Sequence, residues 1–185
     1  MILTGSEEEK LLKAIENEEV EKIKSILENS DKNKKILNLN EKNNIGYYPL
    51  LCATSNYYNN IDIIKLLIDY ANQHKIILEL NEKDKDGDYP LLLAIDNNNI
   101  KIVKLLIEYA NQHQIILDLN EKNNVGNYPI LDATIYNNIE MIKLLIKYAL
   151  QHQITLAYNK NEIDSNYGKL LLQNYEQEKG LWVIK

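Results

Sequence analysis

Three histidines are the side chains of this sequence best suited to bind a metal ion or to transfer protons. His74, His113 and His152 recur at a spacing of 39 residues, and imidazoles are common zinc ligands. If each histidine belongs to its own unit of a stack, neighbouring histidines lie about 10 Å apart, the distance between packed helices. Zinc ligands must instead converge within about 2 Å of one ion. We therefore expect three half-exposed histidines near helix C-termini and no metal site.

Cys52 is the only cysteine and the other candidate for chemistry, as a nucleophile. A reactive thiol needs a neighbouring base, but the nearest histidine in sequence, His74, follows a whole helix later. We expect a small buried side chain, and a single cysteine cannot form an intramolecular disulfide. The acidic residues Glu41, Glu82 and Glu121 occur one per unit, not as the converging pair that glycoside hydrolysis requires. The sequence predicts neither an enzyme nor a bound cofactor.

These candidates are positioned by a segment that the chain repeats three times. Residues 80–118 and 119–157 align without a gap, and the copy before them, 39–79, has two extra residues near Tyr57 and Tyr58. A repeat of this period is typical of units that stack on their neighbours. We predict one solenoid domain made of these three units, an N-terminal capping unit in 1–38 and a partial C-terminal capping unit in 158–185.

Each unit has the pattern of two helices joined by a tight turn. Tyr89-Pro90 opens the first helix, because proline fits the first helical turn. The second helix begins near Ile100, where apolar residues recur at three- and four-residue steps. Between them lies Asn98, and asparagine tolerates the left-handed backbone of a tight reversal. The equivalent residues of the other copies are Asn59 and Asn137. A turn containing a glycine, such as Gly126, leads into the next unit.

The order of helix, tight turn, helix and glycine loop resembles one known repeat family. The pattern D-x-x-G-x-T-P-L-H-x-A, a Gly-His turn and I-V-x-L-L-L can be laid on residues 84–107 almost without gaps. The matching residues are Asp84, Gly87, Pro90, Leu91, Ala94, Val103, Leu105 and Leu106. The three units are thus similar to ankyrin repeats. The resemblance implies an all-α fold, a helical solenoid of stacked helix-turn-helix repeats with loop or β-turn connections.

Departures from the ankyrin pattern predict local differences. The threonine that caps the first helix is replaced by tyrosine, so apolar packing should substitute for the cap. The glycine that ends the second helix is replaced by alanine, so this helix should run about one turn further, through Asn-Gln-His. The residues concerned are Tyr48, Tyr89 and Tyr128, and Ala71, Ala110 and Ala149. Near the C-terminus, residues 165–171 echo 87–93, the beginning of a first helix.

Composition limits the classes of partner. The net charge is −6, and all 21 basic residues are lysines scattered along the chain. Nucleic acids and anionic membranes select clustered positive charge, so we expect neither as a partner. The first residues lack a basic leader, and no apolar run approaches the length of a membrane span. We expect an intracellular, cytoplasmic and monomeric protein.

In ankyrin proteins a concave strip of loop tips and first-helix faces commonly contacts a partner, and the resemblance implies the same here. Apolar and aromatic residues at these positions add a hint from residue type, since tyrosine is a favoured anchor of interfaces. The candidate contact residues are Asn44, Ile45, Tyr47, Ser55, Tyr57, Tyr58, Lys85, Asp86, Asp88, Asp96, Asn97, Val125, Asn127, Ile135 and Tyr136.

Two functions remain open from the sequence. The first is a non-catalytic interaction module that binds a protein or peptide of unknown identity on this strip. The second is a structural spacer or self-assembling array without a dedicated ligand. A spacer would tolerate replacement of Tyr47 or Tyr136 without losing any association, whereas an interaction module would not.

Overall fold

The computed structural model describes residues 5–55, 60–163 and 165–183. This part of the chain contains nine helices and no strand, which confirms the predicted all-α fold. The helices are α1 (Glu7–Glu16), α2 (Val20–Lys32), α3 (Pro49–Ser55), α4 (Ile61–His74), α5 (Pro90–Asp96), α6 (Ile100–His113), α7 (Pro129–Ile135), α8 (Ile139–Gln151) and α9 (Asn166–Val183).

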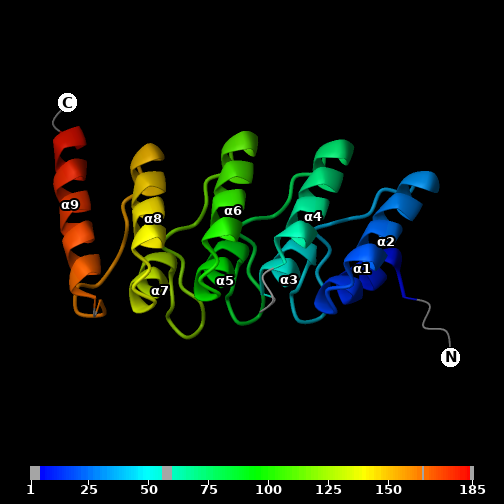
Figure 1. The fold of residues 1–185 in the computed structure, drawn as a ribbon, viewed down its shortest axis with the longest axis horizontal. Helices are drawn as coiled ribbons and strands as arrows, with labels where there is room; N and C mark the ends of the chain where they lie inside the picture. Colours follow the sequence, from blue (N-terminus) through cyan, green and yellow to red (C-terminus); the bar gives the residue numbers. More distant parts are fainter. Residues whose placement is uncertain (1–4, 56–59, 164, 184–185) are drawn as a thin grey trace.

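The helices lie in two rows that follow the order of the chain (Figure 1). In the outer row, α2, α4, α6, α8 and α9 stand side by side, and each contacts the next. In the inner row, α1, α3, α5 and α7 do the same, and each also packs on the outer helix that follows it. One continuous apolar cluster, from Leu11 to Tyr175, fills the space between the rows. The predicted helical solenoid is confirmed.

The inner helices α3, α5 and α7 are short because a left-handed residue soon follows them. Each has seven residues, and the chain then turns through Asn98 at φ 52° or Asn137 at φ 49°, as predicted. Asn59, the third expected position, lies outside the described residues. The outer helix then starts at an asparagine cap: Asn99 Oδ1 accepts hydrogen bonds from the backbone N–H groups of Lys101 and Ile102, both at 3.1 Å. One asparagine therefore supplies the left-handed residue of the turn, and the next one caps the helix that follows.

The outer helices run past the place where the family glycine would stop them. α4 ends at His74 and α6 at His113, as the alanine substitutions predict. Lys75 and Gln114 then adopt the left-handed conformation, with φ of 57° and 58°. α8 ends one residue earlier than its counterparts, at Gln151. The predicted extra turn is confirmed in α4 and α6 and is one residue shorter in α8.

The tyrosines that replace the capping threonine are buried and bind the next unit. Tyr89 and Tyr128 precede α5 and α7 without any side-chain cap, and Tyr89 is completely buried. Its hydroxyl donates to the carbonyl oxygen of Glu121 at 3.0 Å. Tyr48 likewise lies 3.0 Å from the carbonyl oxygens of Glu79 and Glu82. The expected apolar packing is present, and each hydroxyl adds a hydrogen bond between units that the sequence pattern did not reveal.

A second set of tyrosines performs a similar role in the outer row. The hydroxyl of Tyr109 accepts a hydrogen bond from the backbone N–H of Leu78 at 3.1 Å, and Tyr148 does the same for Leu117 at 3.0 Å. Both rings are at most 2% exposed. A buried N–H without a partner is costly. Each outer tyrosine therefore stabilises the connector of the unit before it.

The last helix, α9, corresponds to a second helix and not to the first helix expected from residues 165–171. It lies in the outer row against α8 (Figure 1). The hydroxyl of Tyr175 accepts from the backbone N–H of Leu156 at 3.0 Å and donates to the carbonyl of Ile154 at 2.8 Å, as Tyr148 contacts Leu117 and Ile115. The prediction was wrong because the match of 165–171 to 87–93 is weaker than the match of 171–175 (LLQNY) to 105–109 (LLIEY).

One asparagine in each unit joins neighbouring connectors. Asn81 donates from Nδ2 to the carbonyl of Ile116 at 2.7 Å and accepts at Oδ1 from the N–H of Asp118 at 3.2 Å. Asn40 and Asn120 make the same two bonds to their own next connectors. This pair of asparagine bonds is thus the same at three successive joints.

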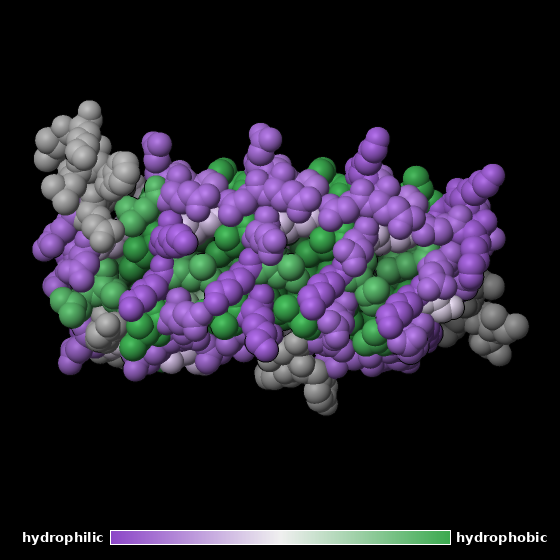
Figure 2. Space-filling view, turned by 45° about the horizontal axis from the view of Figure 1, so that its top comes forward, coloured by the Kyte–Doolittle hydropathy of each residue, from purple (hydrophilic) through white to green (hydrophobic). Residues whose placement is uncertain are grey.

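The surface carries the period of the repeat. Apolar patches recur along the length of the molecule, separated by polar side chains (Figure 2). Three connectors each carry one exposed isoleucine, namely Ile36, Ile77 and Ile116, which are 58%, 50% and 51% exposed. We call these residues the connector isoleucines.

Candidate functional site

The strip predicted from the sequence begins with three loop tips, and each tip is held by its own first side chain. In the loop before α5, Asp84 Oδ1 accepts from the backbone N–H groups of Asp86 and Asp88, both at 2.9 Å. Asn43 and Asn123 hold the loops before α3 and α7 in the same way. Bonds of this kind are the usual role of Asp and Asn in turns. Local sequence therefore fixes the shape of each tip.

The tips are also bonded to one another. The backbone N–H of Asn124 donates to the carbonyl of Asp86 at 2.9 Å, and its Nδ2 donates to the carbonyl of Lys85 at 2.8 Å. Gly87 has a positive φ of 80°, and a Cβ there would lie 3.0 Å from the Cα of Asn123 in the next tip. Glycine thus permits both the turn and the close approach. The result is a rigid row of loops.

Four large apolar side chains of the strip are exposed to solvent. Val125 is 81% exposed, Ile135 60%, Ile45 52% and Tyr136 45%. Ile45 and Val125 lie at loop tips, while Ile135 and Tyr136 lie at the end of α7. None of these four is required by the turn geometry, which depends on Asn43, Asn123 and the glycines.

Three carboxyl groups lie near one another in the middle of the strip, between α5 and α7. Asp88 Oδ1 accepts from Asn123 Nδ2 at 2.8 Å, and Asp96 Oδ1 accepts from the hydroxyl of Tyr136 at 2.9 Å. Asp132, on α7, is only 2% exposed, and its Oδ2 has no hydrogen-bond partner among the described residues. Burial raises the pKa of Asp132 to about 7, and the carboxylates of Asp96 and Asp88 contribute to the increase.

Asp132 is the residue of this region that the candidate list omitted. Its equivalents in the other two units are Cys52 and Leu93. A charged residue at a position that is otherwise uncharged was the signal that could have identified it. Burial also raises the pKa of Asp88, with smaller increases from Asp84, Asp86 and Asp96.

The other predicted strip residues differ in their surroundings. Those exposed at the loop tips are Asn44, Lys85 and Asp86, and those half-buried at the base of the loops are Tyr47 and Asn127. Ser55 donates to the carbonyl of Cys52 at 2.8 Å. Asn97 donates to the carbonyl of Thr54 at 2.9 Å, which joins two inner helices. Tyr57 and Tyr58 lie outside the described residues.

Cys52 has no feature of a nucleophile. Its side chain is 1% exposed, and burial, with a contribution from Glu16, raises the pKa of the thiol to about 12. The thiolate is the reactive form of cysteine. The prediction of a small buried side chain is confirmed.

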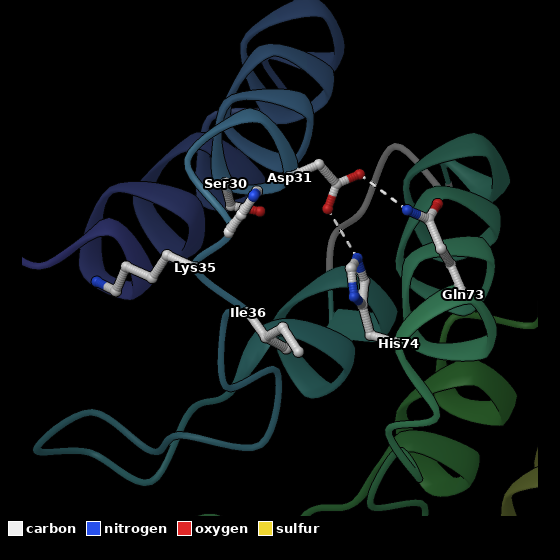
Figure 3. A pocket seen from close by; sticks show the side chains of 7 residues that line it. Ser30, Asp31, Lys35, Ile36, Gln73 and His74 are labelled. Atoms are coloured by element: carbon white, nitrogen blue, oxygen red, sulfur yellow. Dashed lines mark hydrogen bonds and ion pairs between the residues drawn. The ribbon is translucent and has the colours of Figure 1, made fainter.

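The three histidines lie in a row, one at each of the first three joints of the outer row, from α2–α4 to α6–α8; we call this row the ladder and each contact a rung. His74 Nε2 lies 2.7 Å from Asp31 Oδ1, and Gln73 donates to Asp31 Oδ2 at 3.0 Å, so these side chains point toward one another (Figure 3). His113 and His152 contact an asparagine of the preceding helix instead, at 3.1 and 2.9 Å. All three are half-buried, as predicted.

A cavity of about 310 Å³ lies beside the first rung of this ladder. It is lined by Ser30, Asp31, Lys34, Lys35, Ile36, Gln73 and His74. The hydroxyl of Ser30 forms a hydrogen bond with that of Tyr70 at 2.8 Å, so Ser30 is not free to act as a nucleophile beside the His74–Asp31 pair. The arrangement supports the joint between α2 and α4 and does not resemble a hydrolytic centre.

Two further observations concern the described part of the chain only. Nowhere in it do three His, Cys, Asp or Glu side chains converge in the way that a metal ion needs. None of its helices combines the length and apolar character that crossing a membrane requires.

The comparisons with known proteins agree with the geometry. The family model for ankyrin repeats, in three copies, matches residues 11–116 and 72–156. These two ranges together cover the stack from α1 to the connector after α8. A search of curated proteins gave no match.

Proposed function

Because the chain belongs to the ankyrin repeat family, we propose that it is a non-catalytic interaction module whose strip of loop tips and first helices binds a protein or peptide. Ankyrin repeats are in general protein–protein interaction modules. Beyond this general role, we propose where on this chain the partner binds and that the chain catalyses no reaction.

The observation that carries the proposal is the exposure of apolar side chains on a rigid support. Ile45, Val125 and Ile135 are each more than half exposed, while the loops that carry two of them are held by their own hydrogen bonds. Covering exposed apolar side chains with a partner removes them from water, which lowers the free energy and favours binding. A rigid surface loses little conformational entropy on binding, which favours affinity.

The test is affinity capture with the 185-residue chain and two triple variants. The first variant carries Ile45→Ser, Val125→Ser and Ile135→Ser on the strip. The matched control replaces the three connector isoleucines by serine, which are similarly exposed. We expect a partner from the native source to be retained by the wild type and by the control variant and to be lost by the strip variant. Circular dichroism should verify equal helicity of all three chains.

The alternative of a spacer or self-assembling array gives the opposite result. A partner lost only by the control variant would place the contact on the connectors, and self-association abolished by either variant would favour an array.

We propose in addition that the protein is monomeric, acts inside the cell in the cytoplasm, and is divided into units at residues 39, 80, 119 and 158. Light scattering and limited proteolysis test the monomer and the unit boundaries.

A further inference from the structure

The middle of the strip carries negative charge that no lysine neutralises. The aspartates there are Asp84, Asp86, Asp88, Asp96 and Asp132. The ion pairs formed within the described residues involve none of the five. At the joints beside them, by contrast, Lys42 pairs with Glu82 at 2.7 Å and Lys83 with Glu121 at 2.9 Å. Lys42 and Lys83 thus pair with glutamates, and Lys85, between Asp84 and Asp86 at the loop tip, forms no ion pair within the described residues.

Asp132 distinguishes this group from an ordinary solvated cluster. Its side chain is 2% exposed, and Oδ2 lacks a hydrogen-bond partner among the described residues. Leaving a buried carboxylate unpaired is expensive, and natural cores rarely keep one without a use. The carboxylates of Asp96 and Asp88 both oppose the ionisation of Asp132. A positive group bound beside Asp132 would favour its ionised form and supply the partner that Oδ2 lacks.

Aromatic side chains lie near two of the three carboxylates, Asp88 and Asp96. Tyr136 reaches Asp96 with its hydroxyl at 2.9 Å from the α7 side. Tyr47 lies on the α3 side, where burial raises its pKa and the charges of Asp84, Asp86 and Asp88 add to the increase. Carboxylates beside aromatic rings suit a lysine ammonium or an arginine guanidinium, which pairs with the former and stacks on the latter.

We infer that the segment bound by the strip places a lysine or arginine side chain between Asp88 and Asp96, above Asp132, an inference that rests on the proposed function. The positions equivalent to Asp88 are Tyr47 and Asn127, and those equivalent to Asp96 are Ser55 and Ile135. Only the second unit offers a pair of carboxylates, so a single basic residue fixes the position of the segment along the strip. The apolar tips on either side then contact apolar residues of the same segment.

The test uses a phage-displayed library of random peptides, selected on the wild-type chain. The variant that removes the acidic side chains of the strip, called the acidic variant below, carries Asp88→Asn, Asp96→Asn and Asp132→Asn. Its control carries Glu41→Gln, Asp69→Asn and Glu108→Gln, the same change of charge at exposed positions elsewhere. We expect enriched peptides to share one Lys or Arg among apolar residues. Such a peptide should bind the acidic variant at least about tenfold more weakly than the wild type, and the control should differ from the wild type by less than about twofold.

A double-mutant cycle completes the experiment. Replacing the basic residue of the peptide by Gln should weaken binding to the wild type and have little further effect on the acidic variant. The acidic variant should also be at least as stable as the wild type, which a merely structural role of the aspartates would not give. Enriched peptides that need Ile45 and Val125 but contain no basic residue would overturn this inference and leave the proposed function standing. A library that gives no peptide dependent on the strip would overturn both.

Discussion

Asp132 places a carboxyl group where the other units have a thiol or an aliphatic side chain. Its burial and the two neighbouring aspartates oppose ionisation, which explains a pKa of about 7 against the usual value of 3.8. A carboxyl whose folded pKa is raised binds its proton more tightly in the folded state. Between pH 4 and 7 the folded state therefore holds more protons than the unfolded state, and the free energy of unfolding falls as the pH rises through this window.

Replacing Asp132 by asparagine should remove this loss of stability. Asp132→Asn should be more stable than the wild type at pH 8 by roughly 2 to 4 kcal/mol, since each unit of pKa shift corresponds to about 1.4 kcal/mol. The advantage should decrease as the pH falls and vanish below about pH 3, where the wild-type carboxyl is protonated in both states. Urea unfolding of both chains at several pH values measures the difference. An advantage that is constant with pH would contradict the assigned protonation behaviour.

The sequence predicted single residues well where backbone geometry selects them. Asn98, Asn137, Gly87 and Gly126 adopt the positive φ that their types and places indicated. The sequence was a poor guide where the surroundings of a residue come from another unit. The burial of Asp132 depends on how α5 and α7 pack, and neither helix contains this information alone.

At the scale of helices, tyrosine hydroxyls join one unit to the next. Tyr109 is the clearest case, because its hydroxyl is the partner of the Leu78 N–H at 3.1 Å and also lies 3.4 Å from the carbonyl of Ile76. The ring itself packs in the apolar core. The ring and the hydroxyl thus contribute in separate ways, and substitution by phenylalanine removes only the second.

Tyr109→Phe should destabilise the protein by about 1 to 3 kcal/mol, the usual cost of leaving a buried backbone donor without a partner. Tyr136→Phe is the matched control, because Tyr136 is 45% exposed and its hydroxyl bonds Asp96 at the surface, where a substitution costs less than about 0.5 kcal/mol. Thermal unfolding followed by circular dichroism gives both values. Equal effects of the two substitutions would mean that the Leu78 N–H finds another partner.

Helix positions could be predicted from the sequence because proline, asparagine and apolar spacing are local signals. The extension of α4 and α6 to a histidine followed from a single substitution, Gly to Ala. The echo of 87–93 in residues 165–171 did not indicate the place of α9 in the outer row, which depends on contacts such as that of Tyr175 with the connector at Leu156. Contacts between units could thus not be inferred from local sequence patterns.

At the scale of the whole molecule, each helix makes its main contacts with the helices beside it in the stack. Contacts connect α3 with α5, α5 with α7, and the outer helices in the same order. Stability in such a molecule is a sum of unit and joint contributions, so the ends have fewer joints than the middle.

Native-state hydrogen exchange should therefore be slowest in α5 and α6 and faster in α1 and α9, which have neighbours on one side only within the described chain. Amide exchange followed by mass spectrometry on peptic fragments resolves these segments. Equal protection from α1 to α9 would show instead that the stack unfolds as one cooperative unit.

The asparagine bonds between connectors have a consequence for how the length of this protein can change. Asn40, Asn81 and Asn120 each contact the following connector in the same manner, so this set of contacts is not reserved for one place in the order. A copy of residues 80–118 spliced in after Asp118 would therefore form the same connector bonds on both of its sides. The connectors thus allow the molecule to lengthen by whole units, while a new partner is met by changing side chains at the tips.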